Sequence, residues 1–418
     1  MTRCYRYALS FVTGFILLVG HCGADEWPQY RGPAGDGKST ETIGEVDWSS
    51  GQPDVLWKTE TPLGFSSPAV ADGRMFTLIS ADDQEFCLAL DANSGKELWR
   101  VALGSSDYEH DGGNAGAPDN RGGDGPRSTP TVVGSNVYVY TAQLALFCLN
   151  AETGAPIWKH DIVDEFAGRN IKWRNASSPI VADNLVIVGG GGAGESFLAF
   201  NKDDGQVVWK SGDETITHAT PTLTTIADTK QIIFFVQSGL VAADPTTGKE
   251  LWRAEFPFSV STAASPVVSG DKVYCSAGYG VGAGLFQIQS NAKAEELWFK
   301  PNELMNHWST PVVHNGHLYG MFEFKKYGKA PLQCVELATG EIKWEHRGFG
   351  PGNCILVGDK LVALSDAGEV VIAAAQPGEY QELARAKVLE GKCWSTPAFS
   401  NGRIYVRSTE QAAAIAVD

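Results

Sequence analysis

The sequence lacks the features that mark several common classes of protein. No two cysteines are separated by two residues, so neither a zinc ribbon nor a thioredoxin-like redox motif is expected. The long apolar run, Phe11 to Gly20, is shorter than the ~20 residues that span a bilayer, so we do not expect a membrane-spanning protein. Basic residues are few, since 33 Lys and Arg stand against 49 Asp and Glu. This acidic balance argues against nucleic acid or an anionic membrane surface as a partner.

The first 24 residues have the pattern of a secretory signal peptide. Two arginines come before the apolar run, and small residues follow it up to Ala24. We therefore predict cleavage after Ala24, which leaves 25–418 as a single domain in the periplasm or outside the cell. Lipidation at Cys22 is the less favoured alternative, because His21 stands where a small residue would be expected.

Cysteine is scarce in the predicted mature chain, and each cysteine lies in an apolar, strand-like context. Small buried side chains explain this placement more simply than a disulfide framework does. The six residues are Cys87, Cys148, Cys275, Cys334, Cys354 and Cys393.

What the sequence does contain is a motif that recurs along most of its length. The copy CLALDANSGKELW combines an apolar strand, a polar turn with Asp and Gly, and a short strand that ends in Trp99. The Asp can hydrogen-bond its own turn, and the Gly takes the positive φ that such a turn needs. We expect each Trp to pack against the neighbouring repeat. Further copies end at Trp57, Trp158, Trp209, Trp252, Trp298 and Trp344.

A Ser-Pro or Thr-Pro pair confirms the period of the repeat. These pairs end at Pro68, Pro130, Pro179, Pro221, Pro266, Pro311 and Pro397. The last gap, of 86 residues, is twice the usual one, and the segment 352–357 lies where the missing pair would be. Four short strands for each unit of about 42 residues indicate a β-propeller. The sequence therefore predicts an all-β fold, an eight-bladed β-propeller.

The N-terminal segment is predicted to close the ring. The eighth unit, which begins at Thr396, supplies three strands before the chain ends, whereas Asp54 to Trp57 forms a strand with no unit of its own. Pairing of the two would complete the last blade and remove an exposed sheet edge.

Two linkers between blades are expanded, 100–129 and 159–178, and long loops on a regular scaffold often carry function. The first packs acidic residues among glycines, which is compatible with a calcium site, a substrate lid or a solvated loop. From their position in this loop, Asp111 and Asp124 are candidate catalytic bases.

The residues just before each inner strand should point toward the mouth of the central channel. Aromatic, cationic and amide side chains gather there, as expected of a pocket for a flat, polar or anionic ligand. The alternative is that they merely fill the hole of a wide propeller. The candidates are Arg127, Trp173, Arg174, Asn175, His218, His307, Trp308, Asn353 and Trp394.

The repeat Leu-Asp-Ala-Xaa-Ser-Gly-Lys-Xaa-Leu-Trp resembles the tryptophan-docking repeat of the pyrroloquinoline quinone (PQQ) propeller superfamily, over nearly all of the mature chain. The opening Trp-Pro-Gln-Tyr-Arg-Gly-Pro is similar to that of exported PQQ-like repeat proteins, often labelled polyvinyl-alcohol dehydrogenase-like. One branch of the superfamily contains quinoprotein alcohol and sugar dehydrogenases that use PQQ and calcium. Another contains BamB, a cofactor-free scaffold of outer-membrane assembly.

The resemblance implies one of two functions. The first is a quinoprotein dehydrogenase that oxidises an alcohol or polyol, with PQQ and calcium as cofactors. The second is a non-enzymatic scaffold that binds an envelope protein partner. The chain lacks the two adjacent cysteines usual in the dehydrogenases. The motifs that hold their calcium ligands and catalytic Asp do not match any segment of this sequence, so none of those residues is carried over.

Overall fold

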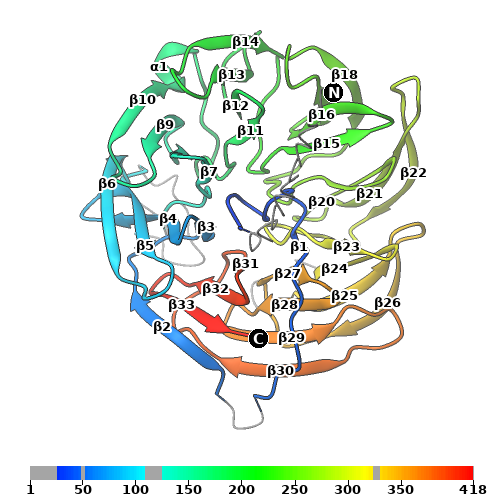
Figure 1. The fold of residues 1–418 in the computed structure, drawn as a ribbon. Helices are drawn as coiled ribbons and strands as arrows, with labels where there is room; N and C mark the ends of the chain where they lie inside the picture. The colour runs from blue at the N-terminus through cyan, green and yellow to red at the C-terminus, as the bar shows by residue number, and fades with distance from the viewer. Residues whose placement is uncertain (1–25, 49–51, 109–124, 323–329, 418) are drawn as a thin grey trace, which may run out of the picture.

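The computed structural model describes residues 26–48, 52–108, 125–322 and 330–417. Eight four-stranded antiparallel blades are arranged in a ring, with the first strand of each blade next to the axis (Figure 1). This confirms the predicted eight-bladed β-propeller. The predicted signal peptide, Asp111 and Asp124 lie outside the described residues. Within the described residues no helix is long and apolar enough to cross a bilayer.

The blades are numbered in chain order, and each is given from its inner to its outer strand. Blades 1 to 4 are β3 (Ala69–Ala71), β4 (Arg74–Ala81), β5 (Gln84–Asp91), β6 (Glu97–Ser105); β7 (Thr131–Val133), β8 (Asn136–Tyr140), β9 (Ala145–Asn150), β10 (Pro156–Asp161); β11 (Ile180–Ala182), β12 (Leu185–Gly189), β13 (Phe197–Asn201), β14 (Val207–Ser211); and β15 (Thr222–Ile226), β16 (Thr229–Val236), β17 (Gly239–Ala243), β18 (Glu250–Glu255). Blades 5 to 8 are β19 (Val267–Ser269), β20 (Lys272–Ala277), β21 (Gly282–Ile288), β22 (Ala294–Pro301); β23 (Val312–His314), β24 (His317–Met321), β25 (Leu332–Glu336), β26 (Glu341–His346); β27 (Asn353–Val357), β28 (Lys360–Leu364), β29 (Glu369–Ala374), β30 (Glu382–Lys387); and β31 (Ala398–Ser400), β32 (Arg403–Arg407), β33 (Gln411–Ala416), β2 (Asp54–Glu60).

The ring is closed as the sequence predicts. Strand β2 pairs antiparallel with β33 as the outer strand of blade 8, so the two ends of the chain share one sheet. A short helix, α1 (Ile162–Glu165), lies in the second long linker and is capped by the carboxylate of Asp161. The six cysteines of the described residues are free and buried, as expected.

Six of the seven repeat tryptophans donate a hydrogen bond to the next blade, in line with the predicted packing of each tryptophan against the neighbouring repeat. The Nε1 of Trp57, for example, donates to the carbonyl of Ala92 at 2.9 Å, which joins blade 8 to blade 1. The equivalent bonds come from Trp99, Trp158, Trp209, Trp298 and Trp344. Trp252 departs from this pattern, because its Nε1 donates to Gln231 of its own blade at 2.5 Å.

The turn glycine has a second role that the sequence did not reveal. A Cβ on Gly95 would lie 2.6 Å from Cδ2 of Trp57, so the ring of the preceding blade lies directly on the glycine. Gly154 and Gly205 meet the tryptophan of the preceding blade in the same way. In blade 5, Ala292 has a positive φ of 60° in the corresponding turn, and the Nε1 of Trp252 in the preceding blade bonds to Gln231 instead of to this turn.

A β-bulge just before the tryptophan position recurs in the outer strand of every blade. In blade 8, Val55 pairs with Ile415 and Trp57 with Ala414, so Leu56 is the extra residue. Leu56 is consequently turned outward and is 40% exposed, while Trp57 is turned toward the next blade. A bulge also interrupts the unpaired outer edge of each blade, which protects it from pairing with other chains.

Around the axis, the Ser or Thr of each Ser/Thr-Pro pair ties neighbouring blades together. The N–H of Thr129 donates to the hydroxyl of Ser178, and the N–H of Ser178 donates to that of Thr220, at 2.9 and 3.0 Å. The bond from Thr396 to Ser67, at 2.8 Å, closes the ring between blades 8 and 1. In blade 7 the repeat without a Pro has Asn353 instead, whose amide donates to the carbonyl of Trp394 in blade 8.

Candidate functional site

A pocket lies on the axis of the ring, at the face where the linkers between blades meet. Its space amounts to about 900 Å³, part of it open to solvent. One position of the repeat supplies seven of its 16 lining residues, namely the residue three before the repeat Pro. These residues are Phe65, Arg127, Ala176, His218, Ala263, Trp308 and Trp394.

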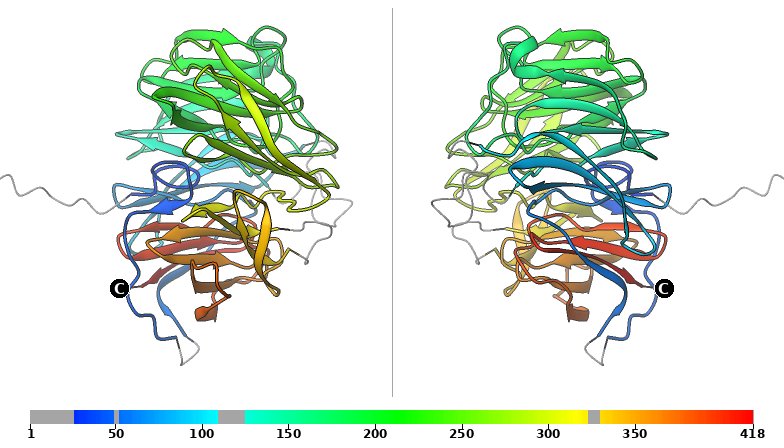
Figure 2. Two further views of the ribbon diagram at one scale, coloured as in Figure 1. Left: turned by 90° about the vertical axis from the view of Figure 1, so that its right-hand side faces the viewer. Right: turned by 90° about the vertical axis from the view of Figure 1, so that its left-hand side faces the viewer.

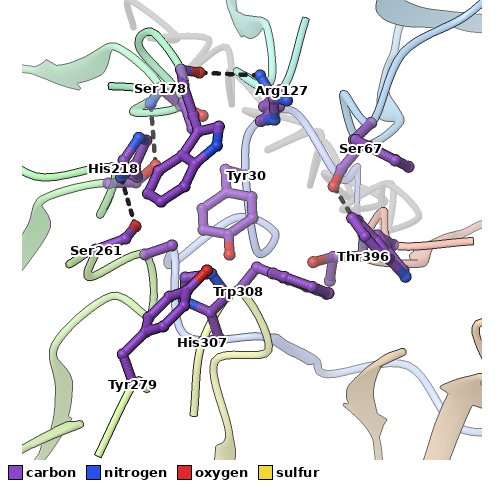
Figure 3. A pocket seen from close by; sticks show the side chains of 16 residues that line it. Tyr30, Ser67, Arg127, Ser178, His218, Ser261, Tyr279, His307, Trp308 and Thr396 are labelled. Carbon is purple, nitrogen blue, oxygen red and sulfur yellow. Dashed lines mark hydrogen bonds between the residues drawn. The ribbon is translucent and has the colours of Figure 1, made fainter. Parts of the chain in front are cut away.

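The floor of the pocket is Tyr30, which the sequence analysis did not identify. Its ring lies at the centre of the labelled side chains in Figure 3. Tyr30 belongs to an N-terminal strap, residues 26–42, that crosses the opposite end of the channel (Figures 1 and 2). Arg31 anchors the strap, since its buried guanidinium donates to the carbonyls of Thr310 and Pro311 at 2.6 and 2.8 Å.

Aromatic rings form a nearly continuous wall around the pocket. Trp308 and Trp394 lie 4.1 Å apart between centroids, and Phe65 stacks on Trp394 at 4.8 Å. On the other side, His307 contacts both Trp308 and Tyr279, at 4.8 and 5.0 Å. Such faces suit a flat ligand, which can stack on or between them.

The charges at the pocket are positive. Arg127 lines it, and its guanidinium donates to the carbonyl of Trp173 at 3.0 Å. The ammonium groups of Lys172 and Lys392 lie 4.8 and 4.9 Å from the rings of Trp173 and Trp394. Among the described residues that line the pocket there is no Asp or Glu. The site is therefore suited to an anion rather than to a cation.

Both histidines of the pocket are neutral at physiological pH. Burial lowers the pKa of His218 to about 4, and burial together with His218 lowers the pKa of His307 to about 3. His218 is held in one tautomer, since its Nε2 donates to the carbonyl of Lys172 and its Nδ1 accepts from the hydroxyl of Ser261, each at 2.9 Å. The histidines are thus polar walls and weak bases.

A buried acid lies behind the pocket wall. The carboxyl group of Glu85 accepts hydrogen bonds from the Tyr108 hydroxyl and the N–H of Ala142, and the charge of Arg127 acts on it. Burial raises the pKa of Glu85 to about 7 in spite of these partners. Glu85 fixes the start of the first long linker at Tyr108 and does not line the pocket.

The structure brings six of the nine predicted site residues together around the pocket: Arg127, Trp173, His218, His307, Trp308 and Trp394. The other three lie outside it. Arg174 donates to the carbonyl of Tyr108, Asn175 is fully buried and bonds to backbone groups, and Asn353 joins blades 7 and 8. Phe65 and Tyr279 were missed, although Phe65 occupies the same repeat position as Arg127 and Trp308.

The protein-family model described as outer membrane protein assembly factor BamB matches residues 83–346, which is more than half of the chain. The chain belongs to this family. Escherichia coli K12 BamB is 24% identical over 324 residues, which cover 64% of this chain and 75% of that protein. The quinohemoprotein alcohol dehydrogenase ADH IIB of Pseudomonas putida is 30% identical over 174 residues, 40% of this chain and 23% of the enzyme.

Solved structures from both groups share the fold. BamB from Moraxella catarrhalis superimposes with a TM-score of 0.60 at 15% identity, over 89% of this chain and 99% of that one. Quinohemoprotein alcohol dehydrogenase from Comamonas testosteroni gives 0.67 at 14% identity, over 94% and 80%. The predicted resemblance to the PQQ-like propellers is thus confirmed, and the BamB-family chain is at the same time similar to quinoprotein dehydrogenases.

Proposed function

We propose that this BamB-family chain is an exported propeller that binds a planar, anionic small molecule in its axial pocket, with PQQ as the ligand class to test first. The observation that carries the proposal is the aromatic wall together with three cations and, among the described lining residues, no carboxylate. A pocket filled only to plug the ring would not need positive charge around it. The proposal includes an export signal at 1–24 and a single propeller unit at 25–418.

The described residues fit the flat, anionic part of PQQ. Trp308 and Trp394 offer ring faces for stacking, and Arg127 offers a guanidinium that suits a carboxylate. Lys392 adds charge at the same side of the pocket. Tyr30 would limit how deep the ligand enters. PQQ, when bound, supplies two-electron redox chemistry.

The residues do not equally fit a metal ion. No group of three or more His, Cys, Asp or Glu side chains that could hold one occurs in the described parts of the chain. We therefore derive no step through calcium. Oxidation of an alcohol or polyol would also need a base, and the two histidines, neutral with lowered pKa values, are weak ones. The predicted bases, Asp111 and Asp124, lie outside the described residues, so the proposal is one of binding.

The test is a titration of the purified protein with PQQ, with and without Ca²⁺, followed by tryptophan fluorescence and by calorimetry. We expect saturable quenching at one site. Trp308→Ala should weaken binding about tenfold through loss of stacking, whereas Trp308→Phe should retain most of the affinity. Lys392→Met should weaken binding, whereas Lys387→Met, at the end of β30 and paired with Glu390 away from the pocket, should not.

Absence of heat and of quenching would refute PQQ binding. Equal affinities for Trp308→Ala and the unchanged protein would place any binding outside the pocket.

The family match favours a second candidate function, a scaffold that binds a protein partner in the cell envelope. It rests on the match over residues 83–346 and on the similarity to BamB of E. coli, an outer membrane protein assembly factor. The test is cross-linking and affinity purification from the envelope of the cells that produce the protein. Recovery of outer-membrane assembly proteins in stoichiometric amounts would support it, and recovery of the propeller alone would count against it.

A further inference from the structure

The N-terminal strap bonds to the axis-facing ends of five of the eight blades. Its contacts are Trp27 with Val70 in blade 1, Pro28 with Val132 in blade 2, Arg31 with Thr310 and Pro311 in blade 6, β1 (Lys38–Ser39) with β27 in blade 7, and Glu41 with Asn401 and Gly402 in blade 8. Among the described residues, no backbone–backbone hydrogen bond joins the strap to blades 3, 4 or 5, which are consecutive in the ring.

In blades 1, 2 and 7, the strap bonds to one and the same position of the inner strand. It is the second-to-last strand residue, whose N–H and C=O point away from the neighbouring strand and toward the axis. The N–H of Val70 donates to the carbonyl of Trp27 at 2.7 Å, and that of Val132 donates to the carbonyl of Pro28 at 2.8 Å. In blade 7 the N–H of Leu356 donates to the carbonyl of Gly37 at 2.9 Å, next to the parallel pairing of β1.

The corresponding residue of blade 4 is Thr225 in β15. A two-residue turn, Ala227 and Asp228 with φ of 48° and 61°, joins β15 to β16 and makes Ile226 and Thr229 a hydrogen-bonded pair. Because hydrogen-bonded pairs alternate along an antiparallel ladder, Leu223 and Thr225 direct their backbone groups toward the axis. Within the described residues neither has a backbone partner there.

The unpaired backbone edge of β15 is also longer than those of the inner strands in the two flanking blades. It has five residues, as does β27, whereas β11 and β19 in the flanking blades have three each. The edge of β27 is covered by β1, and the edge of β15 is not. Five extended residues span about 17 Å, enough for a short added strand.

A groove lies between β15 and the strap. It consists of two adjoining cavities with about 850 and 810 Å³ of space, part of it open to solvent. Ala34, Gly35 and residues 222–225 line both cavities, so the two are continuous along β15. The groove is therefore the sector of the channel end that the strap leaves open.

We propose that this groove binds an extended peptide segment of a partner protein by strand addition to β15. The strap itself shows that the inner edges of these blades accept extended chain, and the groove continues the strap's own interface. The segment would exchange hydrogen bonds with Leu223 and Thr225 and would have small side chains toward Ala34 and Gly35. The site is separate from the axial pocket proposed for PQQ, since only Tyr30 and Thr220 line both.

The test begins with a phage-displayed library of random linear peptides selected against the full mature chain. A selected peptide is then synthesised, and its Kd is measured by fluorescence polarisation. Thr225→Pro removes the axis-facing N–H but no bond to β16, so the hairpin should persist. Thr225→Val is the matched control, because it keeps the N–H and removes the hydroxyl.

We expect Thr225→Pro to weaken binding at least about tenfold and Thr225→Val to change it less than about threefold. Ala34→Trp, which fills the groove without changing the backbone of β15, should also abolish binding, and it serves as the test if Thr225→Pro does not fold. On binding, the amides of Leu223 and Thr225 should become protected from hydrogen exchange.

Equal Kd values for the unchanged protein, Thr225→Pro and Ala34→Trp would overturn the proposal, and so would a selection that yields no specific peptide. Protection of amides in an outer strand such as β18 instead of β15 would overturn it as well. PQQ binding at the other end of the channel should be unaffected by Thr225→Pro, so failure of one proposal is distinguishable from failure of the other.

Discussion

The contact between Trp57 and Gly95 should decide whether the ring stays closed, and one pair of substitutions tests it. Gly95 has a φ of 68° and lies under the indole ring of Trp57 on the closing strand β2. Gly73, in the same blade, has a φ of 70°, and a Cβ there would meet nothing within 4 Å. Gly73→Ala and Gly95→Ala therefore impose the same backbone strain, and only the second also disturbs the contact.

The magnitudes follow from these two environments. A left-handed conformation costs an alanine about 1 to 2 kcal/mol, so Gly73→Ala should destabilise the fold by that amount. Gly95→Ala adds overpacking against a rigid ring, about 1 to 3 kcal/mol, and loss of the bond from Trp57 to Ala92, about 1 kcal/mol. We therefore expect Gly95→Ala to be more destabilising by about 2 to 4 kcal/mol.

The assay is urea unfolding of both variants and the unchanged protein, followed by tryptophan fluorescence and by circular dichroism. A second readout is limited proteolysis after Glu60 or within β2, which should become faster only in Gly95→Ala if the closing strand is released. Equal destabilisation by the two substitutions would refute the reasoning, because it would mean that the tryptophan contact contributes nothing beyond the backbone conformation.

Four further substitutions should have effects of known sign. Arg31→Met should lower the free energy of unfolding by about 2 to 4 kcal/mol and expose the strap to proteases, because the buried carbonyls of Thr310 and Pro311 lose their hydrogen-bond donor. Burial lowers the pKa of His218 to about 4 from 6.5, so between these pH values the unfolded chain binds more protons than the folded one. The free energy of unfolding should therefore fall by up to about 3 kcal/mol as the pH drops from 6.5 to 4. His218→Gln should reduce this dependence of stability on pH, as measured by urea unfolding at several pH values. Burial raises the pKa of Glu85 to about 7 from 4.5, so the free energy of unfolding should fall as the pH rises from 4.5 to 7. Glu85→Gln lacks this loss, so its stability relative to the unchanged protein should increase over the same pH range by up to about 3 kcal/mol. Tyr30→Ala should join the axial pocket to the groove and weaken PQQ binding several-fold in the quenching titration, because the floor of the pocket is lost.

The fold was largely predictable because the local sequence of each repeat determines its own turn and strands. Asp91 accepts hydrogen bonds from the turn N–H of Asn93 and Ser94, and Gly95 has the positive φ that the pattern requires. The missing strand of blade 8 could be found because Asp54–Glu60 had no unit of its own. Local turn chemistry and a count of strands were sufficient for these inferences.

The candidate site was only partly predictable, because proximity to an inner strand does not determine direction. Asn175 and Trp308 both precede an inner strand, yet Asn175 lies two residues after Trp173, which has a positive φ of 66°, and is buried among backbone groups. Recognition of a single repeat position would have added Phe65 and removed Asn175. Tyr30 could not be found in this way, since the strap is not part of any repeat and is held across the channel by tertiary contacts such as those of Trp27 and Arg31.

The two proposed sites use opposite ends of one channel, and this bears on the choice between ligand-binding protein and scaffold. The walls of the axial pocket are linkers between blades and its floor is Tyr30 of the strap, whereas the groove is built mainly from the strap and the inner strand of blade 4. If both proposals hold, the same chain would bind a small anion at one end and a peptide at the other. Tyr30 and Thr220 are the wall between them, so a peptide that displaces the strap would move the floor of the pocket. Any such coupling must be reciprocal in free energy, and the ligand of the pocket would then alter peptide affinity by the same factor.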